Sequence, residues 1–410
     1  MTTDEHRAAG WRGRAEPITA QEYGTRRSLL SARATEAGAS CQVWWGNHRI
    51  FYLCGFAFAP TERPIGLIIG ASGESVLFVP RLELEHAEAY AHVDRVATYP
   101  EYPGEVHPMQ VLAAELRNMG SKGAFAGDGD GYAKVMGYRG PKLSDLTGAS
   151  FLPLDDVIED EMMVKSPAEV ALIRESAYWA GRAHRLLQDA TRVGRNESEV
   201  EIESASRAGA ELEAAYQGTF RALSFGRTGP FALYRGQVGV HSALPHSLTI
   251  NAVFQPGDTL VTGASGPMFG YWSELERTMF MGEPSAEQQR YFGHMLELQT
   301  LAIDACRAGK PCSSVDRAVR AYFVDNGLEP YWRHHVGHNV GIRYHEGPFL
   351  DSGDDTLMEP GMLFTVEPGV YVPGLGGFRH SDTILVTDGD PEYLTDYPRD
   401  LDSLVLPLEG

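Results

Sequence analysis

The spacing of apolar and polar positions predicts a chain with two α/β parts. Residues 22–38 and 111–119 carry helical patterns. Three short apolar runs separated by turn residues predict strands: Ile50-Phe-Tyr-Leu53, Gly66-Leu-Ile-Ile69 and Ser75-Val-Leu-Phe-Val-Pro80. A charged, weakly periodic stretch near residue 155 then suits a boundary, so we expect an N-terminal α/β domain over residues 1–160.

The second part opens with a strong signal for the start of a helix. Ser166 is placed to cap it, Pro167 occupies the first helical position, and Glu169 can complete a capping box. Apolar spacing then predicts two helices, strands after residue 250, two more helices at about 286–308 and 315–327, and strands again from about 331. We expect this second domain to span residues 161–410.

An internal repeat lies within the second domain. Pro256-Gly257 and Pro360-Gly361 each open a predicted strand, each strand is followed by a second one, at Gly270–Glu274 and Gly377–Ser381, and two helices precede each hairpin. Counting from the paired glycines, Gly263 corresponds to Glu367, and Glu274 corresponds to Ser381. Such a duplicated unit predicts two sheets packed about a pseudo-twofold axis, with both hairpins facing one cleft.

The composition of the chain indicates which kinds of partner and which cellular compartment to expect. The formal charge is 35 − 55 = −20, which disfavours nucleic acid and anionic membranes as partners. No apolar stretch approaches the roughly 20 residues of a membrane span, and the first residues lack the apolar core of a signal peptide. The cysteines lack metal-type spacing and indicate reduced thiols in a cytoplasmic protein: Cys41, Cys54, Cys306 and Cys312.

Two acidic residues mark the first candidate site. Glu274 and Glu276 are two positions apart, so on a strand both side chains would point to one face. A solvated edge strand is the plain alternative, but large neighbours such as Tyr271 favour a buried or cleft-lining strand. Two carboxylates on a buried face require a cation, a metal ion or a shared proton.

Histidines form the second candidate group. Four of them fall within twelve residues, although the whole chain of 410 residues has only 14: His334, His335, His338 and His345. Glu367 is an isolated carboxylate in an apolar strand, and its alternative is a strand end at the surface. His246 follows Pro245 and, taken alone, is typical of a turn.

Together these segments resemble the family of aminopeptidase P, prolidase, methionine aminopeptidase and creatinase. The matching segments are His246, Gly270-Tyr-Trp-Ser-Glu274, His338 with His345, Thr365-Val-Glu-Pro-Gly369 and Phe378-Arg-His-Ser-Asp-Thr383. The resemblance implies the pita-bread fold, a duplicated α/β catalytic domain. Phe51-Tyr-Leu-Cys-Gly-Phe56 and Thr61-Glu-Arg-Pro64 resemble the N-terminal domain of creatinase, so the resemblance covers nearly the whole chain.

The resemblance also implies which residues correspond to the family's ligands for two metal ions. These positions are Gly263, Glu274, His338, Glu367 and Ser381. Glycine has no ligand atom and serine is a poor ligand, so the usual dinuclear site cannot assemble and we expect no cofactor. A single divalent ion bound by Glu274, His338 and Glu367 is the alternative.

Creatinase, which hydrolyses its substrate without metal, provides a second comparison. The two active-site glutamates of creatinase correspond to Glu276 and Glu367 in this chain. Its catalytic histidine corresponds to His246, and its substrate-binding arginine corresponds to Arg63. In creatinase this arginine comes from the partner subunit, so we expect a homodimer. Mutual repulsion of Glu274, Glu276 and Glu367 would also favour a cationic group between them.

The main hypothesis is therefore a metal-independent hydrolase of a C–N bond in a small cationic or zwitterionic molecule, similar to creatinase or ectoine hydrolase. His246 would move the proton, while His338 and His345 would orient the substrate or stabilise an oxyanion. Glu274, Tyr271 and His380 are expected to contact the substrate.

Three alternatives stay open. The first is an Xaa-Pro aminopeptidase or dipeptidase with an altered or mononuclear metal site. The second is a non-catalytic pita-bread scaffold that binds a partner. The third is non-hydrolytic chemistry in the same cleft, such as that of a lyase.

Overall fold

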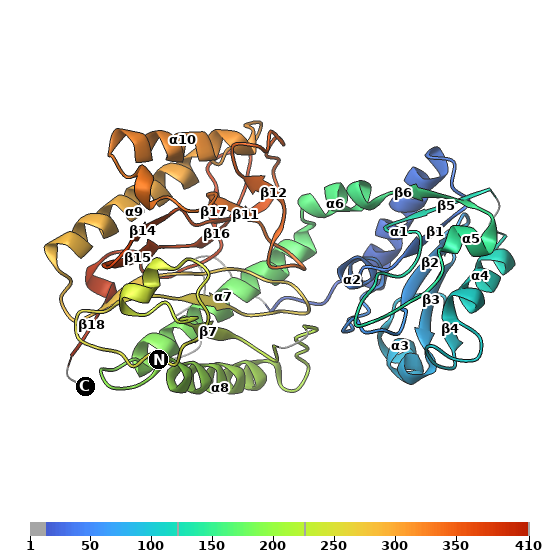
Figure 1. Cartoon of the computed structure of the whole chain (residues 1–410), viewed down its shortest axis with the longest axis horizontal. Helices are drawn as coiled ribbons and strands as arrows, with labels where there is room; N and C mark the ends of the chain where they lie inside the picture. Colours follow the sequence, from blue (N-terminus) through green and yellow to red (C-terminus); the bar gives the residue numbers. More distant parts are fainter. Residues whose placement is uncertain (1–13, 121–122, 225–226, 409–410) are drawn as a thin grey trace. The chain divides into compact units, whose positions relative to one another are not determined.

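A computed structural model describes residues 14–120, 123–224 and 227–408 of the chain, and the chain divides into two compact units (Figure 1). One unit runs from Ile18 to Met162. The other extends from Met163 to the C-terminus and includes the segment that ends at Pro17. Within the described ranges, no helix has the length and apolar character needed to cross a membrane.

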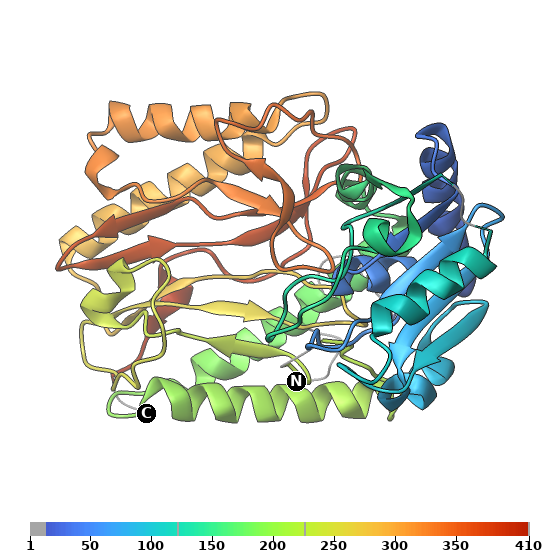
Figure 2. The same ribbon diagram turned by 45° about the vertical axis from the view of Figure 1, so that its right-hand side comes forward.

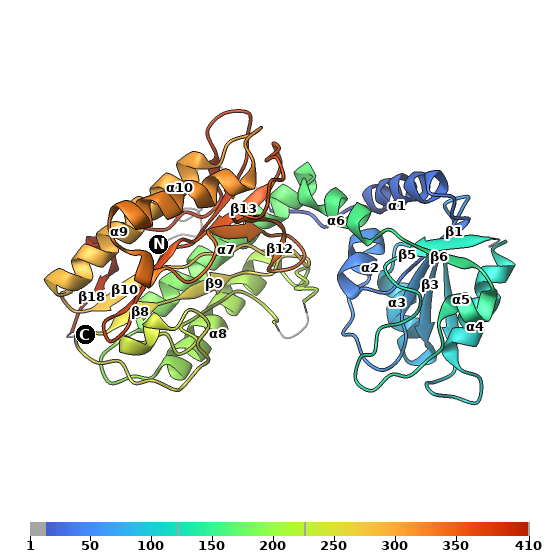
Figure 3. The ribbon, with the colours of Figure 1, turned by 45° about the horizontal axis from the view of Figure 1, so that its top comes forward.

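The N-terminal unit is built on a six-stranded sheet with the order β4-β3-β2-β1-β5-β6. Its strands are β1 (Cys41–Trp44), β2 (Gly66–Gly70), β3 (Ser75–Pro80), β4 (Arg95–Tyr99), β5 (Ala124–Gly127) and β6 (Ser150–Pro153). Its helices are α1 (Ala20–Glu36), α2 (Asn47–Cys54), α3 (Leu84–Tyr90), α4 (Pro108–Asn118), α5 (Leu143–Thr147) and α6 (Asp155–Met163). Figure 3 shows α2 and α3 on one side of this sheet and α4 and α5 on the other.

One strand prediction in this unit is wrong. The apolar run Ile50–Leu53 forms helix α2, and each of its residues is buried. A short apolar run buried on all sides has no periodicity that separates a strand from a helix. The helix ends at Gly55 with φ +74°, where an added Cβ would lie 2.8 Å from the Tyr23 hydroxyl, so both backbone and packing favour glycine there.

The capping prediction for the second unit is confirmed. Helix α7 (Pro167–Ala190) begins after Ser166, whose side chain accepts a hydrogen bond from the Glu169 N–H, while the Glu169 carboxylate accepts one from the Ser166 N–H. Three further helices follow along the chain: α8 (Glu197–Tyr216), α9 (Ala286–Ala305) and α10 (Cys312–Asp325). Ser285 and Gln288 form an equivalent capping box at the start of α9.

Strands lie between these two pairs of helices. They are β7 (Phe231–Leu233), β8 (Thr259–Val261), β9 (Gly263–Ser265), β10 (Thr278–Met281), β11 (Gly337–Asn339), β12 (Glu346–Leu350), β13 (Leu363–Val366), β14 (Gly369–Val372), β15 (Gly376–Arg379), β16 (Asp382–Leu385), β17 (Glu392–Tyr393) and β18 (Val405–Leu406). Figures 1 and 2 show α7 and α8 on one side of the strands and α9 and α10 on the other. The expected repeat of two helices followed by strands is therefore present.

One predicted strand of the repeat is absent. Residues 270–274 form a single isolated bridge, from Tyr271 to Met268, and the next strand, β10, begins at Thr278. Phe269 and Gly270 both have positive φ angles, so the chain turns here instead of continuing as a strand. The irregular stretch still contacts the later strands of this unit. Glu276 forms an antiparallel bridge with Ser381, which lies between β15 and β16.

Candidate active site

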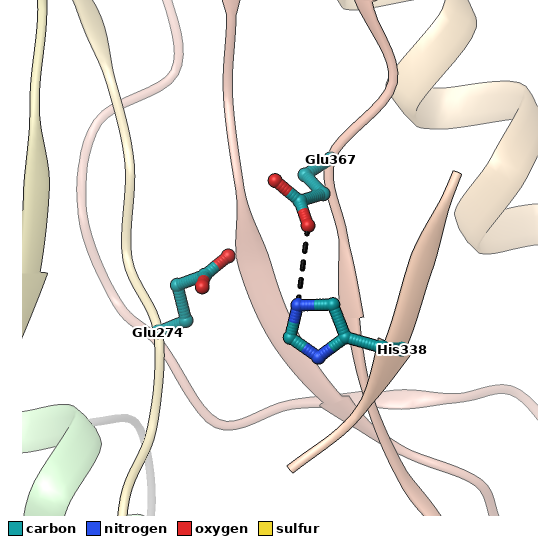
Figure 4. Close-up of side chains that lie close together, drawn as sticks. All are labelled: Glu274, His338 and Glu367. Carbon is teal, nitrogen blue, oxygen red and sulfur yellow. Dashed lines mark ion pairs between the residues drawn. The ribbon is translucent and has the colours of Figure 1, made fainter. Parts of the chain in front are cut away.

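Three residues that can bind a metal ion come together from separate segments of the second unit (Figure 4). His338 lies in β11, Glu367 directly follows β13, and Glu274 lies in the irregular stretch before β10. Strands β11, β13 and β16 are neighbours in one sheet, and the bridge from Glu276 to Ser381 brings in the stretch that carries Glu274. One ligand atom from each of the three residues lies within 4.8 Å of the others.

The ring of His338 has the orientation of a metal-bound imidazole. Its Nδ1 donates to the backbone carbonyl of Asn339 at 3.0 Å, which leaves Nε2 without the proton in the neutral ring. Nε2 lies 3.3 Å from Oε1 of Glu367 and is buried without a regular hydrogen bond among the described residues. Buried and directed at two carboxylates, this nitrogen is a suitable ligand atom.

The charges of the site favour a cation. Burial, together with the carboxylates of Glu367 and Glu276, raises the pKa of Glu274 to about 8. Burial opposes the charged form of His338, but Glu367 and Glu274 outweigh it and raise the pKa of the ring to about 9. Burial likewise opposes the charge on Glu367, whose pKa is nevertheless lowered by His338 and Arg379. A divalent ion would stabilise the ionised carboxylates and compete with the proton on His338.

The residues present fit one divalent ion. Two carboxylates and an imidazole provide three ligands from the protein, the number found in catalytic metal sites that keep a further position open. The other two positions implied by the resemblance do not fit a second ion. Gly263 has no donor atom in a side chain, and the Ser381 hydroxyl donates a hydrogen bond to Oε1 of Glu274 at 2.7 Å.

A positive group does lie among the carboxylates, and it belongs to the chain itself. Arg379 donates from Nη2 to Oε1 of Glu276 at 2.8 Å and from Nε to Oε2, forming a two-pronged ion pair. Both residues are buried, and Nε of Arg379 lies 3.8 Å from Oε2 of Glu367. The sequence pattern predicts a cationic substrate at this position and does not indicate Arg379 as a site residue.

Further groups extend this ion pair. Nη1 of Arg379 donates to the Tyr371 hydroxyl at 2.9 Å, and that hydroxyl lies 2.8 Å from Nε2 of His334. Nδ1 of His334 contacts the carbonyl of His335, so Nε2 accepts the hydrogen bond from Tyr371. Burial lowers the pKa of His334 to about 4 and keeps its ring neutral. The only signal for Arg379 in the sequence was its position two residues before Ser381.

The remaining histidines lie at the edge of the site. The ring of His345 stacks on that of His338 with centroids 3.8 Å apart, and His345 is exposed to solvent. His246 is exposed in a turn, close enough to His345 for its charge to contribute to lowering that residue's pKa, although burial is the main cause. The structure therefore brings His338 and His345 together and leaves His246 at the surface.

Three of the expected substrate-binding residues have other partners. The Tyr271 hydroxyl donates to Oε1 of Glu169 at 2.9 Å. His380 is fully buried, where its Nδ1 accepts from the Thr278 N–H and its Nε2 contacts the Arg399 carbonyl. Arg63 lies in the N-terminal unit and pairs with Glu101 at 2.7 Å and with Glu62 at 2.6 Å.

Comparison with known proteins establishes the family. Residues 171–388, more than half of the 410-residue chain, match "Metallopeptidase family M24", and residues 26–161 match "Creatinase/Prolidase N-terminal domain". The chain therefore belongs to metallopeptidase family M24. The expected resemblance is confirmed, and so is the expected class of enzyme, a hydrolase of C–N bonds.

The relatives span almost the full chain. An uncharacterized peptidase of Staphylococcus haemolyticus is 29% identical over 364 residues, covering 85% of this chain and 93% of its own. "Probable dipeptidase PepE" of Mycobacterium tuberculosis is 28% identical over 392 residues, covering 95% and 98%. Among solved structures, the Xaa-Pro dipeptidase from Bacillus anthracis has a TM-score of 0.78 with 25% identity, covering 95% of this chain and 100% of its own. The Pyrococcus horikoshii prolidase shares the fold, with a TM-score of 0.76, 23% identity, and coverage of 92% and 99%. The pita-bread architecture is confirmed.

These findings correct the main functional hypothesis. A metal-independent hydrolase of a small cationic molecule is the wrong expectation, because the chain belongs to a metallopeptidase family and its relatives are named as peptidases and dipeptidases. The expectation of no cofactor is likewise unsupported. The structure shows one physical reason for the error: the positive charge expected from a substrate beside Glu276 is already supplied by Arg379.

Proposed function

We propose that the chain is a metal-dependent peptidase that cleaves dipeptides or removes the N-terminal residue of short peptides, with Xaa-Pro substrates as the first class to test. The observation that carries the proposal is the convergence of Glu274, His338 and Glu367, with Nε2 of His338 facing both carboxylates. The Xaa-Pro dipeptidase and the dipeptidases among the relatives support the choice of substrate.

In this proposal a single divalent ion binds to Glu274, His338 and Glu367. When bound, such an ion polarises a carbonyl group and lowers the pKa of a water molecule, so that hydroxide is available at neutral pH. The chain's own groups prepare the site. Asn339 holds the His338 ring through Nδ1, and Ser381 holds the carboxylate of Glu274 through Oε1. Buried hydrogen bonds of this kind keep ligand atoms in place before substrate arrives.

His345 and His246 are proposed to contact the peptide at the rim of the site. The exposed ring of His345 stacks on the His338 ring, so it lies next to the proposed ion and is open to solvent. A ring nitrogen there can hydrogen-bond the carbonyl oxygen of the scissile bond or deliver a proton to its departing nitrogen. His246 would hydrogen-bond a more distant part of the peptide.

The Arg63 proposal stands on the creatinase resemblance. We propose that the active form is a homodimer in which Arg63 binds the substrate's carboxylate in the partner's site. Mixing an Arg63→Ala variant with a His246→Ala variant tests it, because one site of each mixed dimer would contain both residues. Partial recovery of activity supports the proposal. No recovery, or a monomer by light scattering, contradicts it.

The decisive experiment measures metal dependence and substrate class together. The full-length protein is stripped with a chelator, reloaded with Mn²⁺ or Zn²⁺, and assayed on Ala-Pro, Ala-Ala and a longer peptide with proline in the second position. We expect cleavage only after reloading, fastest for the proline-containing substrates. Cleavage that persists in excess chelator, or none of any peptide with metal present, contradicts the proposal. We also propose that it works in the reducing cytoplasm, since its four cysteines are free thiols.

A further inference from the structure

Glu276 fills the space in front of Gly263. A Cβ placed on Gly263, in β9, would lie 3.4 Å from Oε1 of Glu276. Gly263 has no positive φ angle that would demand glycine, so its backbone conformation is open to other residues. The absence of a side chain at 263 therefore leaves room for the Glu276 carboxylate, which reaches this space from the neighbouring stretch of chain.

The Glu276 carboxylate is already neutralised in this position. Oε1 accepts from Nη2 of Arg379 at 2.8 Å and from Nη2 of Arg235 at 3.3 Å, and Oε2 accepts from Nε of Arg379. Glu276 is 4% exposed and Arg379 is 2% exposed. A carboxylate held on both oxygens by a buried guanidinium is a poor ligand for an additional ion, because binding the ion would require breaking that pair.

Arg379 has no donor left for a substrate. Its five N–H groups have protein partners, which are both oxygens of Glu276, the Tyr371 hydroxyl at 2.9 Å, the Pro245 carbonyl at 3.4 Å and Oε1 of Gln237 at 3.4 Å. Its Nε also lies 3.8 Å from Oε2 of Glu367. The guanidinium is therefore a permanent positive charge beside the three metal-binding residues, fixed in place by the fold.

Ser381 completes the difference from a two-ion site. Its hydroxyl donates to Glu274, and its backbone N–H and carbonyl both bond to Glu276 at 3.0 Å. The residue thus positions the Glu274 carboxylate and the Glu276 backbone, and it offers no negative charge to an ion. Without a carboxylate at 263 or 381, a second divalent ion would face the Arg379 guanidinium with too few anionic ligands.

We propose that this site binds one divalent ion, and that Arg379, held by Glu276, permanently supplies the positive charge that a second ion would bring to a dinuclear centre. The inference rests on the proposed function, because the ion bound by Glu274, His338 and Glu367 is part of it. Gly263, Glu276 and Ser381 act together: the glycine makes room, the glutamate anchors the guanidinium, and the serine orients the Glu274 carboxylate and the Glu276 backbone.

The wild-type protein tests this without any substitution. The stripped full-length chain is loaded with excess Mn²⁺, freed of loosely bound metal, and its metal content measured by mass spectrometry. We expect one Mn²⁺ per chain and the electron paramagnetic resonance signal of an isolated ion. Two ions per chain with an exchange-coupled signal would overturn the inference, because ions sharing a site lie about 3.5–4 Å apart and couple magnetically.

A rebuilt site tests the cause. The triple variant Gly263→Asp/Glu276→Thr/Ser381→Glu introduces carboxylates at positions 263 and 381. It also removes the Glu276 carboxylate, which fills the space in front of Gly263, so we expect two Mn²⁺ per chain. Its matched control, Ser381→Glu alone, keeps Gly263 and Glu276 and should still bind one. A triple variant with a native circular dichroism spectrum that still binds one ion contradicts the roles given to these residues. If the triple variant does not fold, the wild-type signal decides.

The ion count and the peptide assay separate the two proposals. One ion per chain without cleavage of any peptide contradicts the proposed function and leaves the inference standing. Two ions per chain with metal-dependent cleavage contradict the inference and the single-ion site, and they support the metal-dependent peptidase activity. A chain that binds no ion contradicts both.

Discussion

Glu274 and Glu276 are two residues apart, and their surroundings differ sharply. Glu274 accepts one hydrogen bond from the Ser381 hydroxyl and faces Nε2 of His338 and the carboxylate of Glu367. Glu276 is held on both oxygens by Arg379. Glu274 therefore lies among groups that can bind an added cation, whereas Glu276 is already paired with the guanidinium of Arg379.

The difference shows that burial alone does not decide what a carboxylate does. Both side chains are almost completely buried, at 3% and 4% exposure. Burial and neighbouring carboxylates raise the pKa of Glu274 to about 8, which makes it responsive to an added cation. A buried guanidinium gives Glu276 a fixed partner, which suits a structural and electrostatic role.

The largest expected effect concerns the Glu274 region. His338→Ala removes the one nitrogen ligand, so affinity for Mn²⁺ and metal-dependent turnover should each fall by well over about 100-fold. Metal affinity is measured by calorimetric titration and turnover by peptide cleavage. His294→Ala is the matched control, because that histidine contacts the Tyr322 hydroxyl in the helical layer and should leave both quantities unchanged. Equal loss in both variants would contradict the assignment of His338 as a ligand.

The next effect concerns the Glu276 region and is a loss of stability. Arg379→Gln leaves the Glu276 charge buried without its partner, so the metal-free protein should lose about 3–5 kcal/mol of unfolding free energy in urea. Arg235→Gln removes a second arginine from the same carboxylate. Its side chain is 36% exposed, so the expected loss is only about 0–1 kcal/mol. Similar losses for the two variants would refute the distinction between a buried anchor and an outer contact.

A smaller effect is expected at the residue that joins the two regions. Ser381→Ala removes the hydroxyl that orients Glu274, so the dissociation constant for Mn²⁺ should rise by about 10-fold. Ser204→Ala is the control, because that buried serine donates only to a helix carbonyl, that of Glu201. An unchanged dissociation constant in Ser381→Ala would mean that Glu274 needs no orienting hydrogen bond.

The smallest effect on the free energy of unfolding is expected for an ion pair that is exposed, in contrast to the buried pair of Arg379 and Glu276. Arg63 pairs with Glu101 in the N-terminal unit, with side chains 29% and 51% exposed, so Arg63→Gln should change the unfolding free energy by less than about 1 kcal/mol. Arg49→Gln in the same unit should cost about 2 kcal/mol, because its partner Asp128 is only 2% exposed. The order of the two losses by urea denaturation checks whether burial sets the cost.

Local patterns predicted most of the elements because the forces that specify them act between near neighbours. The cap formed by Ser166 and Glu169 involves residues three apart, and a helix starts there as the sequence predicts. The prediction failed at Ile50–Leu53, where every residue is buried and the apolar run has no polar face. Tertiary packing decided between helix and strand there.

The candidate site was predictable only as far as residue type and order could indicate it. Glu274, His338 and Glu367 were named as ligands of a single ion only in the alternative to a site without metal, and the structure places their ligand atoms together. Their convergence depends on the neighbouring strands β11 and β13 and on the bridge from Glu276 to Ser381. The roles expected for Tyr271 and His380 took no account of the partners that packing gives them.

The sequence by itself determined the capped helices, the internal repeat, the family, and the loss of ligand atoms at Gly263 and Ser381. Each of these follows from local hydrogen bonds, periodic burial or the chemistry of one side chain. Only the tertiary structure decided which charge neutralises Glu276. Its partner Arg379 lies 103 positions away in the chain, and an ion pair forms according to distance in space and burial. The positive group beside Glu276 is therefore an arginine of the chain itself, where a cationic substrate was expected.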